Sequence, residues 1–78
     1  MRNLYFLRIG TDTLDDARAY QTKRGAVAAF GRVARELDQY GQEIDATIHI
    51  AQRPVDVVEY PDFVLTLGPR GGVRVEAA

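Results

Sequence analysis

A chain of 78 residues has room for one domain, residues 1–78, with a single hydrophobic core. Its hydrophobic fraction of 46% is ordinary for a globular protein and argues against wholesale disorder. Ten basic and eleven acidic residues give a net charge of −1. That balance lacks the basic excess of a dedicated nucleic-acid-binding protein and the strong acidity of a protein that imitates DNA.

Cysteine is absent, which excludes disulfides and thiolate metal sites. Small secreted domains usually depend on disulfides, so we expect a cytoplasmic protein. The apolar run within Met1–Gly10 is too short for a signal peptide, and no stretch approaches eighteen apolar residues. We therefore expect no membrane contact.

The first predicted element is a strand at Asn3–Ile9, where aromatic and aliphatic residues dominate. Arg8 shares one face of this strand with Leu4 and Phe6, so we expect the opposite face to point to the core. Leu4 and Phe6 then need another cover or a partner. The core-facing residues would be Tyr5, Leu7 and Ile9.

A polar, turn-like segment follows at Thr11–Asp16, and Ala17–Gln21 after it is ambiguous. Alternation along Ala17–Gln21 favours a short strand. A helix that begins at Thr13 is the alternative, because Thr13 and Asp16 have the spacing of a capping box.

The strongest local pattern predicts a helix at Lys23–Tyr40. Thr22 is placed to cap its first turn, and Gly41 follows as a C′ glycine should. Apolar residues recur at helical spacing and define the expected buried stripe: Ala26, Phe30, Val33 and Leu37, widened by Ala29, Ala34 and Tyr40.

The second half of the chain reads as strands. Ile44–Ala51 alternates between apolar and polar residues, as a half-buried strand does. Val55–Tyr60, between two prolines, predicts an irregular turn or a single helical turn. Phe63–Glu76 predicts a β-hairpin around the turn residues Gly68–Gly71.

These elements predict an α+β fold in which a single helix packs on one face of a mostly antiparallel sheet of four or five strands. The element order is β-(β)-α-β-β-β. The strand in parentheses is the ambiguous segment Ala17–Gln21.

The sequence carries no recognisable catalytic, cofactor-binding or metal-binding set. Serine and cysteine are both absent, so a Ser-His or Cys-His pair is impossible. His49, the only histidine, lies on the polar face of its predicted strand, where we expect it to be exposed or hydrogen-bonded. We therefore expect no enzyme, no cofactor and no metal, with an unfamiliar carboxylate or threonine site as the alternative.

Two charged groups are candidate contact surfaces. One is acidic and consists of Asp12, Asp15 and Asp16. A solvated loop with turn-forming aspartates explains these residues, and contact with arginines on a partner is the functional alternative. The other lies on the helix face opposite the apolar stripe, beside the small residues Ala28 and Gly31, and consists of Arg24, Arg32 and Arg35. It would suit phosphates or carboxylates, or serve as an ordinary solvent face.

Three further residues are candidates for contact with a partner. Arg70 lies at the hairpin turn and Arg74 on the strand that follows it. Gly68–Gly72 has no Gly-Lys-Ser/Thr ending and precedes a strand, so a phosphate loop is not predicted. Tyr60, before Pro61, is either part of a structural corner or an exposed aromatic of the kind that protein-binding surfaces use.

In size, element order and richness in Arg and Asp, the whole chain resembles small proteins encoded by phages and mobile elements, among them anti-CRISPR proteins. The resemblance rests on no motif. It implies an inhibitor that acts in the host cytoplasm by occluding a surface of a CRISPR effector complex, with no reaction of its own.

We therefore expect a non-enzymatic binding protein whose partner is a protein or a ribonucleoprotein complex. The alternative is a nucleic-acid-binding domain that uses the helix and hairpin arginines. A homodimer is also possible, because Leu4 and Phe6 lack an obvious cover.

Overall fold

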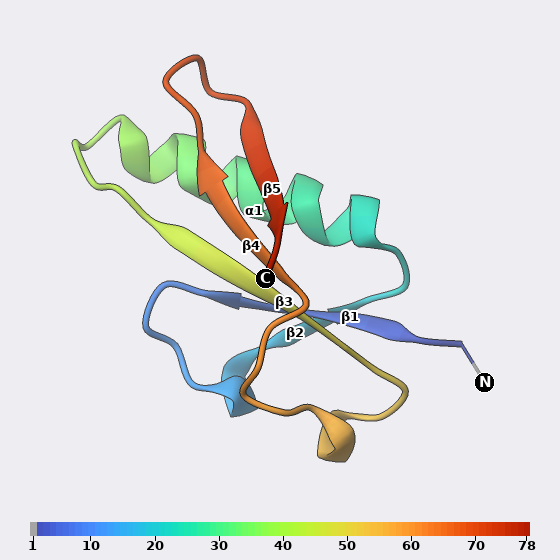
Figure 1. The fold of residues 1–78 in the computed structure, drawn as a ribbon. Coiled ribbons are helices and arrows are strands. Elements are labelled where there is room, and N and C mark those ends of the chain that lie inside the picture. The colour runs from blue at the N-terminus through green and yellow to red at the C-terminus, as the bar shows by residue number, and fades with distance from the viewer. Residues whose placement is uncertain (1) are drawn as a thin grey trace.

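The computed structural model describes residues 2–78, and its order of elements is the expected β-β-α-β-β-β (Figure 1). One helix, α1 (Lys23–Asp38), packs against a five-stranded sheet in which every pairing is antiparallel. The sheet order is β2-β1-β3-β4-β5. The strands are β1 (Leu4–Ile9), β2 (Arg18–Tyr20), β3 (Asp45–Ala51), β4 (Phe63–Leu67) and β5 (Val73–Ala77).

The ambiguous segment before the helix forms a strand, as favoured, although it is only three residues long. β2 pairs with β1 at one edge of the sheet. Thr13 donates a side-chain hydrogen bond to Asp16 at 3.2 Å but caps no backbone N–H, and only a short 3-10 helix, Leu14–Asp16, forms there. The alternative helix from Thr13 is therefore wrong.

Both predicted end signals of α1 operate. The Thr22 hydroxyl accepts a hydrogen bond from the backbone N–H of Gly25 at 3.0 Å. Regular helix ends at Asp38, two residues before the expected Tyr40. Gly41 then adopts φ +74°, and the N–H of Gln42 reaches back to the carbonyl of Leu37 at 3.1 Å.

The main core lies between α1 and the sheet face that carries Leu7, as the alternation in the first strand predicted. The expected buried stripe of the helix is wrong at two residues, Val33 and Tyr40, which are exposed. The buried face of α1 is rotated toward its small residues. It consists of Ala26, Ala29, Phe30, Gly31 and Ala34.

Gly31 corrects a second expectation. The sequence places Gly31 on the exposed face of the helix beside the arginines, but in the structure Gly31 is buried against β5. A Cβ at Gly31 would lie 3.1 Å from Val73 Cγ2 and 3.0 Å from Arg35 Nη1. The missing side chain therefore lets the helix approach the edge of the sheet closely.

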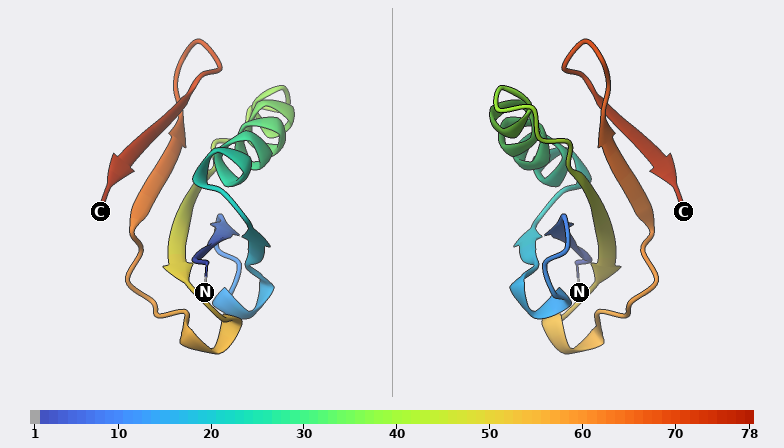
Figure 2. Two further views of the ribbon diagram at one scale, coloured as in Figure 1. Left: turned by 90° about the vertical axis from the view of Figure 1, so that its right-hand side faces the viewer. Right: turned by 90° about the vertical axis from the view of Figure 1, so that its left-hand side faces the viewer.

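The sheet face away from α1 is also covered by the chain itself. Phe6 and His49, which pair across β1 and β3, are 4% and 1% exposed. Figure 2 shows the segment between β3 and β4 on this side of the sheet, with α1 on the other. Phe6 therefore needs no partner to cover it, which removes our main reason for expecting a dimer at this face.

The ends of α1 are tied to the C-terminal hairpin. The ammonium group of Lys23 lies 4.4 Å from the centre of the Phe63 ring on β4. Arg35, in the last turns of the helix, donates a hydrogen bond to the carbonyl of Gly71 at 3.1 Å.

No helix within residues 2–78 is long and apolar enough to span a bilayer.

Candidate functional site

The long connection between β3 and β4, residues 52–62, presents a group of large apolar side chains to solvent. Val55 is 81% exposed, Val58 61% and Tyr60 84%. All three follow the end of β3: Val55 lies within a short 3-10 helix, Pro54–Asp56, and Val58 and Tyr60 come after it. Three large apolar side chains exposed within one short loop offer an interaction surface more than a single exposed one would.

His49 fixes the middle of this loop from beneath. Its Nδ1 lies 2.8 Å from the carbonyl oxygen of Val58, and its Nε2 lies 2.9 Å from the hydroxyl of Thr47. A carbonyl oxygen only accepts, so Nδ1 carries a proton and donates to Val58. The sequence predicted an exposed or hydrogen-bonded histidine. The second alternative is correct, but the ring is buried because the loop lies over it.

Asp62 fixes the far end of the loop through three bonds. Its carboxylate accepts from the N–H of Ile50 at 2.7 Å. Its own N–H donates to the carbonyl of Ile48 at 2.8 Å, and its carbonyl accepts from the N–H of Ala78 at 3.1 Å. One residue thus joins β3, the start of β4 and the end of β5, and so forms a structural corner directly after Tyr60 and Pro61.

A salt bridge closes the first turn of the loop. Arg53 donates to both carboxylate oxygens of Asp56, at 3.0 and 3.3 Å. This is the one ion pair within residues 2–78. Both side chains are largely exposed, so the bond shapes the turn more than it stabilises the fold.

The loop is therefore ordered while its apolar side chains point outward. A surface of this kind loses little conformational entropy on binding, because its backbone is already held in place. Tyrosine is also among the residues that contribute most to protein–protein affinity. The arrangement suits contact with a protein surface.

The sequence identified one residue of this surface, Tyr60. It missed Val55 and Val58 as exposed residues and His49 and Asp62 as their supports. The one sequence feature that could have indicated this surface is the apolar stretch between Pro54 and Pro61, which has neither the spacing of a helix nor that of a strand.

The acidic candidates lie in one exposed loop between β1 and β2. Asp15 and Asp16 belong to the 3-10 helix Leu14–Asp16, and Asp12 precedes it. Asp16 accepts a hydrogen bond from the Thr13 hydroxyl, and all three aspartates are exposed to solvent.

The arginine candidates do not form one surface. Arg24 and Arg32 are exposed on α1, whereas Arg35 bends back to the hairpin turn. Arg70 is exposed at that turn. Arg74 lies on the sheet face away from the helix, because its neighbours Val73 and Val75 pack against the core.

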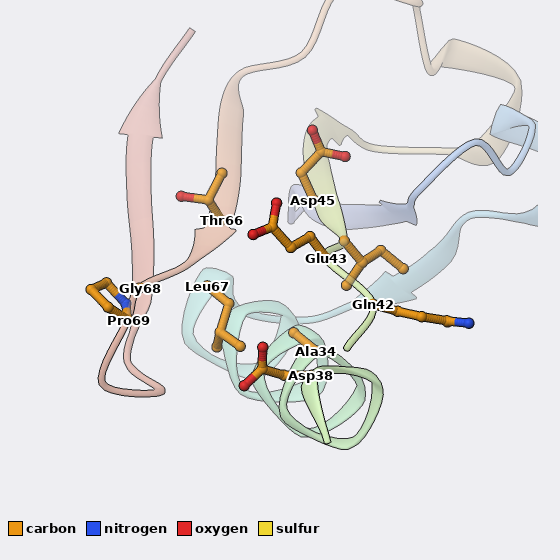
Figure 3. A pocket seen from close by; sticks show the side chains of 10 residues that line it. Ala34, Asp38, Gln42, Glu43, Asp45, Thr66, Leu67, Gly68 and Pro69 are labelled. Atoms are coloured by element: carbon orange, nitrogen blue, oxygen red, sulfur yellow. The ribbon is translucent and has the colours of Figure 1, made fainter. Parts of the chain in front are cut away.

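A pocket of ≈ 550 Å³ opens between the end of α1, the start of β3 and the end of β4. Figure 3 shows three carboxylate side chains around it, from Asp38, Glu43 and Asp45. In the part of the chain that the structure describes, no three His, Cys, Asp or Glu side chains are grouped so that they could hold a metal ion. These carboxylates line the pocket without converging on a site.

The chain matches no protein-family model, no curated protein and no solved structure.

Proposed function

We propose that this chain is a binding protein that inhibits or modulates a larger protein or ribonucleoprotein partner by covering part of its surface. The observation that carries the proposal is the group of three exposed apolar side chains on the ordered loop 52–62. Nothing in the internal packing of the fold uses Tyr60, which is 84% exposed.

The partner surface that fits this loop has an apolar hollow for Tyr60 and the two valines. Glu59 is exposed beside Tyr60 and belongs to no ion pair within residues 2–78. Basic side chains at the rim of the hollow would therefore complement the loop.

Site-specific crosslinking tests the proposal directly. A photoreactive amino acid placed at position 60 is expected to form a covalent adduct with the partner in the native host, and mass spectrometry identifies the product. The matched control carries the same amino acid at Tyr40, which is also a highly exposed tyrosine but lies outside the loop. Adducts at both positions, or at neither, would contradict a role for the loop.

Affinity for the partner identified in this way supplies the second measurement. Tyr60→Ala is expected to weaken binding at least tenfold, because truncating a central aromatic residue commonly costs about 2 kcal/mol or more. Tyr40→Ala should leave the affinity unchanged. Equal affinities for the two variants would show that another surface makes the contact.

The anti-CRISPR form of the proposal has its own assay. Expression of the wild-type chain is expected to restore phage plaques on a host with an active CRISPR system, and Tyr60→Ala is expected to reduce that rescue. No rescue across several system types would reject this form while leaving binding itself to be measured by crosslinking.

We propose nucleic-acid binding as the second candidate, on one observation. Arg18 of β2 and Arg32 of α1 line the same hollow of ≈ 340 Å³, together with Tyr20. Paired guanidinium groups beside an aromatic ring suit a single-stranded nucleic acid. Affinity for a labelled oligonucleotide should then fall steeply with salt and be lost in the Arg18→Glu/Arg32→Glu double variant. No binding at low salt would reject this candidate.

A further inference from the structure

The two edges of the sheet differ in how well they are protected. β2 offers only three residues at its edge, which leaves little backbone for another strand to pair with. β5 offers five residues, Val73–Ala77, without proline, and its pairing with β4 runs unbroken along the strand. Natural sheets usually protect an edge with short strands, proline, bulges or charged side chains, and of these β5 has only the charged residues Arg74 and Glu76.

The hydrogen bonds at the two ends of the β4–β5 pairing show which backbone groups of β5 are free. Gly68 donates to Gly72 at 2.7 Å and Ala78 donates to Asp62 at 3.1 Å. Hydrogen-bonded pairs alternate with non-bonded pairs in an antiparallel ladder. The even-numbered residues of β5 therefore face β4. The N–H and C=O groups that point outward belong to Val73, Val75 and Ala77.

We propose that β5 pairs with β5 of a second copy of this chain, antiparallel and centred on Val75. In this register, Val75 lies opposite Val75 of the second copy, and Val73 lies opposite its Ala77. The outward-pointing N–H and C=O groups of one copy then face those of the second copy, which gives roughly six backbone hydrogen bonds across the interface. The inference does not rest on the proposed function, because it is argued from the backbone and side chains of β5 and not from the exposed side chains of the loop 52–62.

Charge complementarity selects a second copy over an unrelated strand. Arg74 and Glu76 lie exposed on one face of β5. In the register centred on Val75, Arg74 lies directly opposite Glu76 of the second copy, and the twofold symmetry repeats this pair. Both pairs occupy non-bonded positions, where facing side chains are closest. Within one copy these residues face Thr66 and Val64 across the strands, so neither has a cross-strand charge partner there.

The outer edge of β5 is open to another strand. Within residues 2–78, β5 is the last strand of the sheet and no strand lies beyond it (Figure 1). Because the twofold axis of such a pair stands perpendicular to the sheet, both helices lie on the same side of a continuous sheet. The half-buried Val75 side chains then meet on that side.

Charge reversal with sedimentation equilibrium tests the proposal. The wild type is expected to dimerise as concentration rises. Arg74→Glu or Glu76→Arg alone sets like charges opposite each other and should weaken the dimer roughly ten- to hundredfold. The double variant Arg74→Glu/Glu76→Arg restores opposite charges and should return the dissociation constant to near the wild-type value. All three variants change only the exposed residues Arg74 and Glu76, so circular dichroism should show the same fold for each.

Amide exchange gives a second, position-specific measurement. Exchange at Val73, Val75 and Ala77 should slow as concentration rises, while Arg74 and Glu76 are already protected within one copy. A monomer at every concentration would overturn the proposal. So would equal dissociation constants for the single and double variants, or a dimer that Tyr60→Ala abolishes and charge reversal leaves intact.

Discussion

The contact between His49 and the loop above it predicts the effect of a single substitution on stability. In His49→Leu, a side chain of similar volume keeps the site filled, so the cavity contribution is small. The carbonyl of Val58 then loses its donor. Val58 is 61% exposed, so water can take the place of the lost donor, and we expect the loss of one net hydrogen bond, about 1 kcal/mol.

That loss is measurable for a domain of this size. At about 0.05–0.15 kcal/mol per residue, the whole fold is worth roughly 4–12 kcal/mol. With an m-value of about 1 kcal/mol/M for a small protein in urea, the unfolding midpoint should fall by roughly 1 M. Thr47 contributes little to the loss, because its half-buried hydroxyl can turn to water.

Two measurements separate this account from a general loss of packing. His49→Asn carries an amide N–H close to the position of Nδ1, so it should recover part of the stability that His49→Leu loses. Amide exchange in residues 50–62 should rise in His49→Leu more than exchange in α1 does. An unchanged urea midpoint for His49→Leu, with unchanged exchange in the loop, would refute the reasoning.

Three further pairs of substitutions test the packing of α1 and the turns of the chain, with urea unfolding as the measurement. Gly31→Leu should lower the free energy of unfolding by about 1–3 kcal/mol, because a side chain at this position pushes the helix away from β5. Its control, Ala28→Leu on the exposed face of the helix, should change the free energy of unfolding by less than about 0.5 kcal/mol. Gly41→Ala should lower the free energy of unfolding by about 1 kcal/mol, because Gly41 has a φ of +74° that alanine adopts only with strain. Gly72 likewise has no atom within 4 Å of an added Cβ but has no positive φ, so Gly72→Ala should raise the free energy of unfolding by roughly 0.5 kcal/mol. Thr22→Ala should cost about 1 kcal/mol and Thr22→Ser much less, and equal losses would argue against the cap.

Local signals were sufficient to predict the fold class. The Thr22 cap, the C′ glycine at Gly41 and the alternation in Ile44–Ala51 each depend on a few neighbouring residues, and all three operate as expected. The sequence also indicated the correct core face of β1. Once one helix and five strands are in place, few antiparallel arrangements bury the apolar faces.

The errors arise where burial depends on a distant segment. Gly31 lies at the margin of the helical stripe, and its burial depends on β5, whose position follows from the strand order. The alternation of apolar and polar residues along β3 correctly places His49 on the sheet face away from the helix. His49 is buried because the loop 52–62 crosses that face, and an irregular loop carries no period that would reveal its path.

The candidate site was harder to predict than the fold for the same reason. Tyr60 could be named because an aromatic residue before proline is conspicuous. The valines near it have the composition of a buried segment, and only the path of the chain shows that Val55 and Val58 point outward. Arg35 was misplaced among free arginines because its acceptor, Gly71, is distant in sequence.

The position of β1 in the sheet has a consequence for folding kinetics. β1 lies between β2 and β3, and its register with β3 joins Leu4 to Ala51. This pairing must close a loop that contains β2 and all of α1 before the centre of the sheet exists, and such non-local contacts slow folding. During synthesis on a ribosome, β1 must therefore wait for β3 to emerge, with only the short β2 as an earlier sheet neighbour. The hairpin of β4 and β5, by contrast, can form as soon as it has been made.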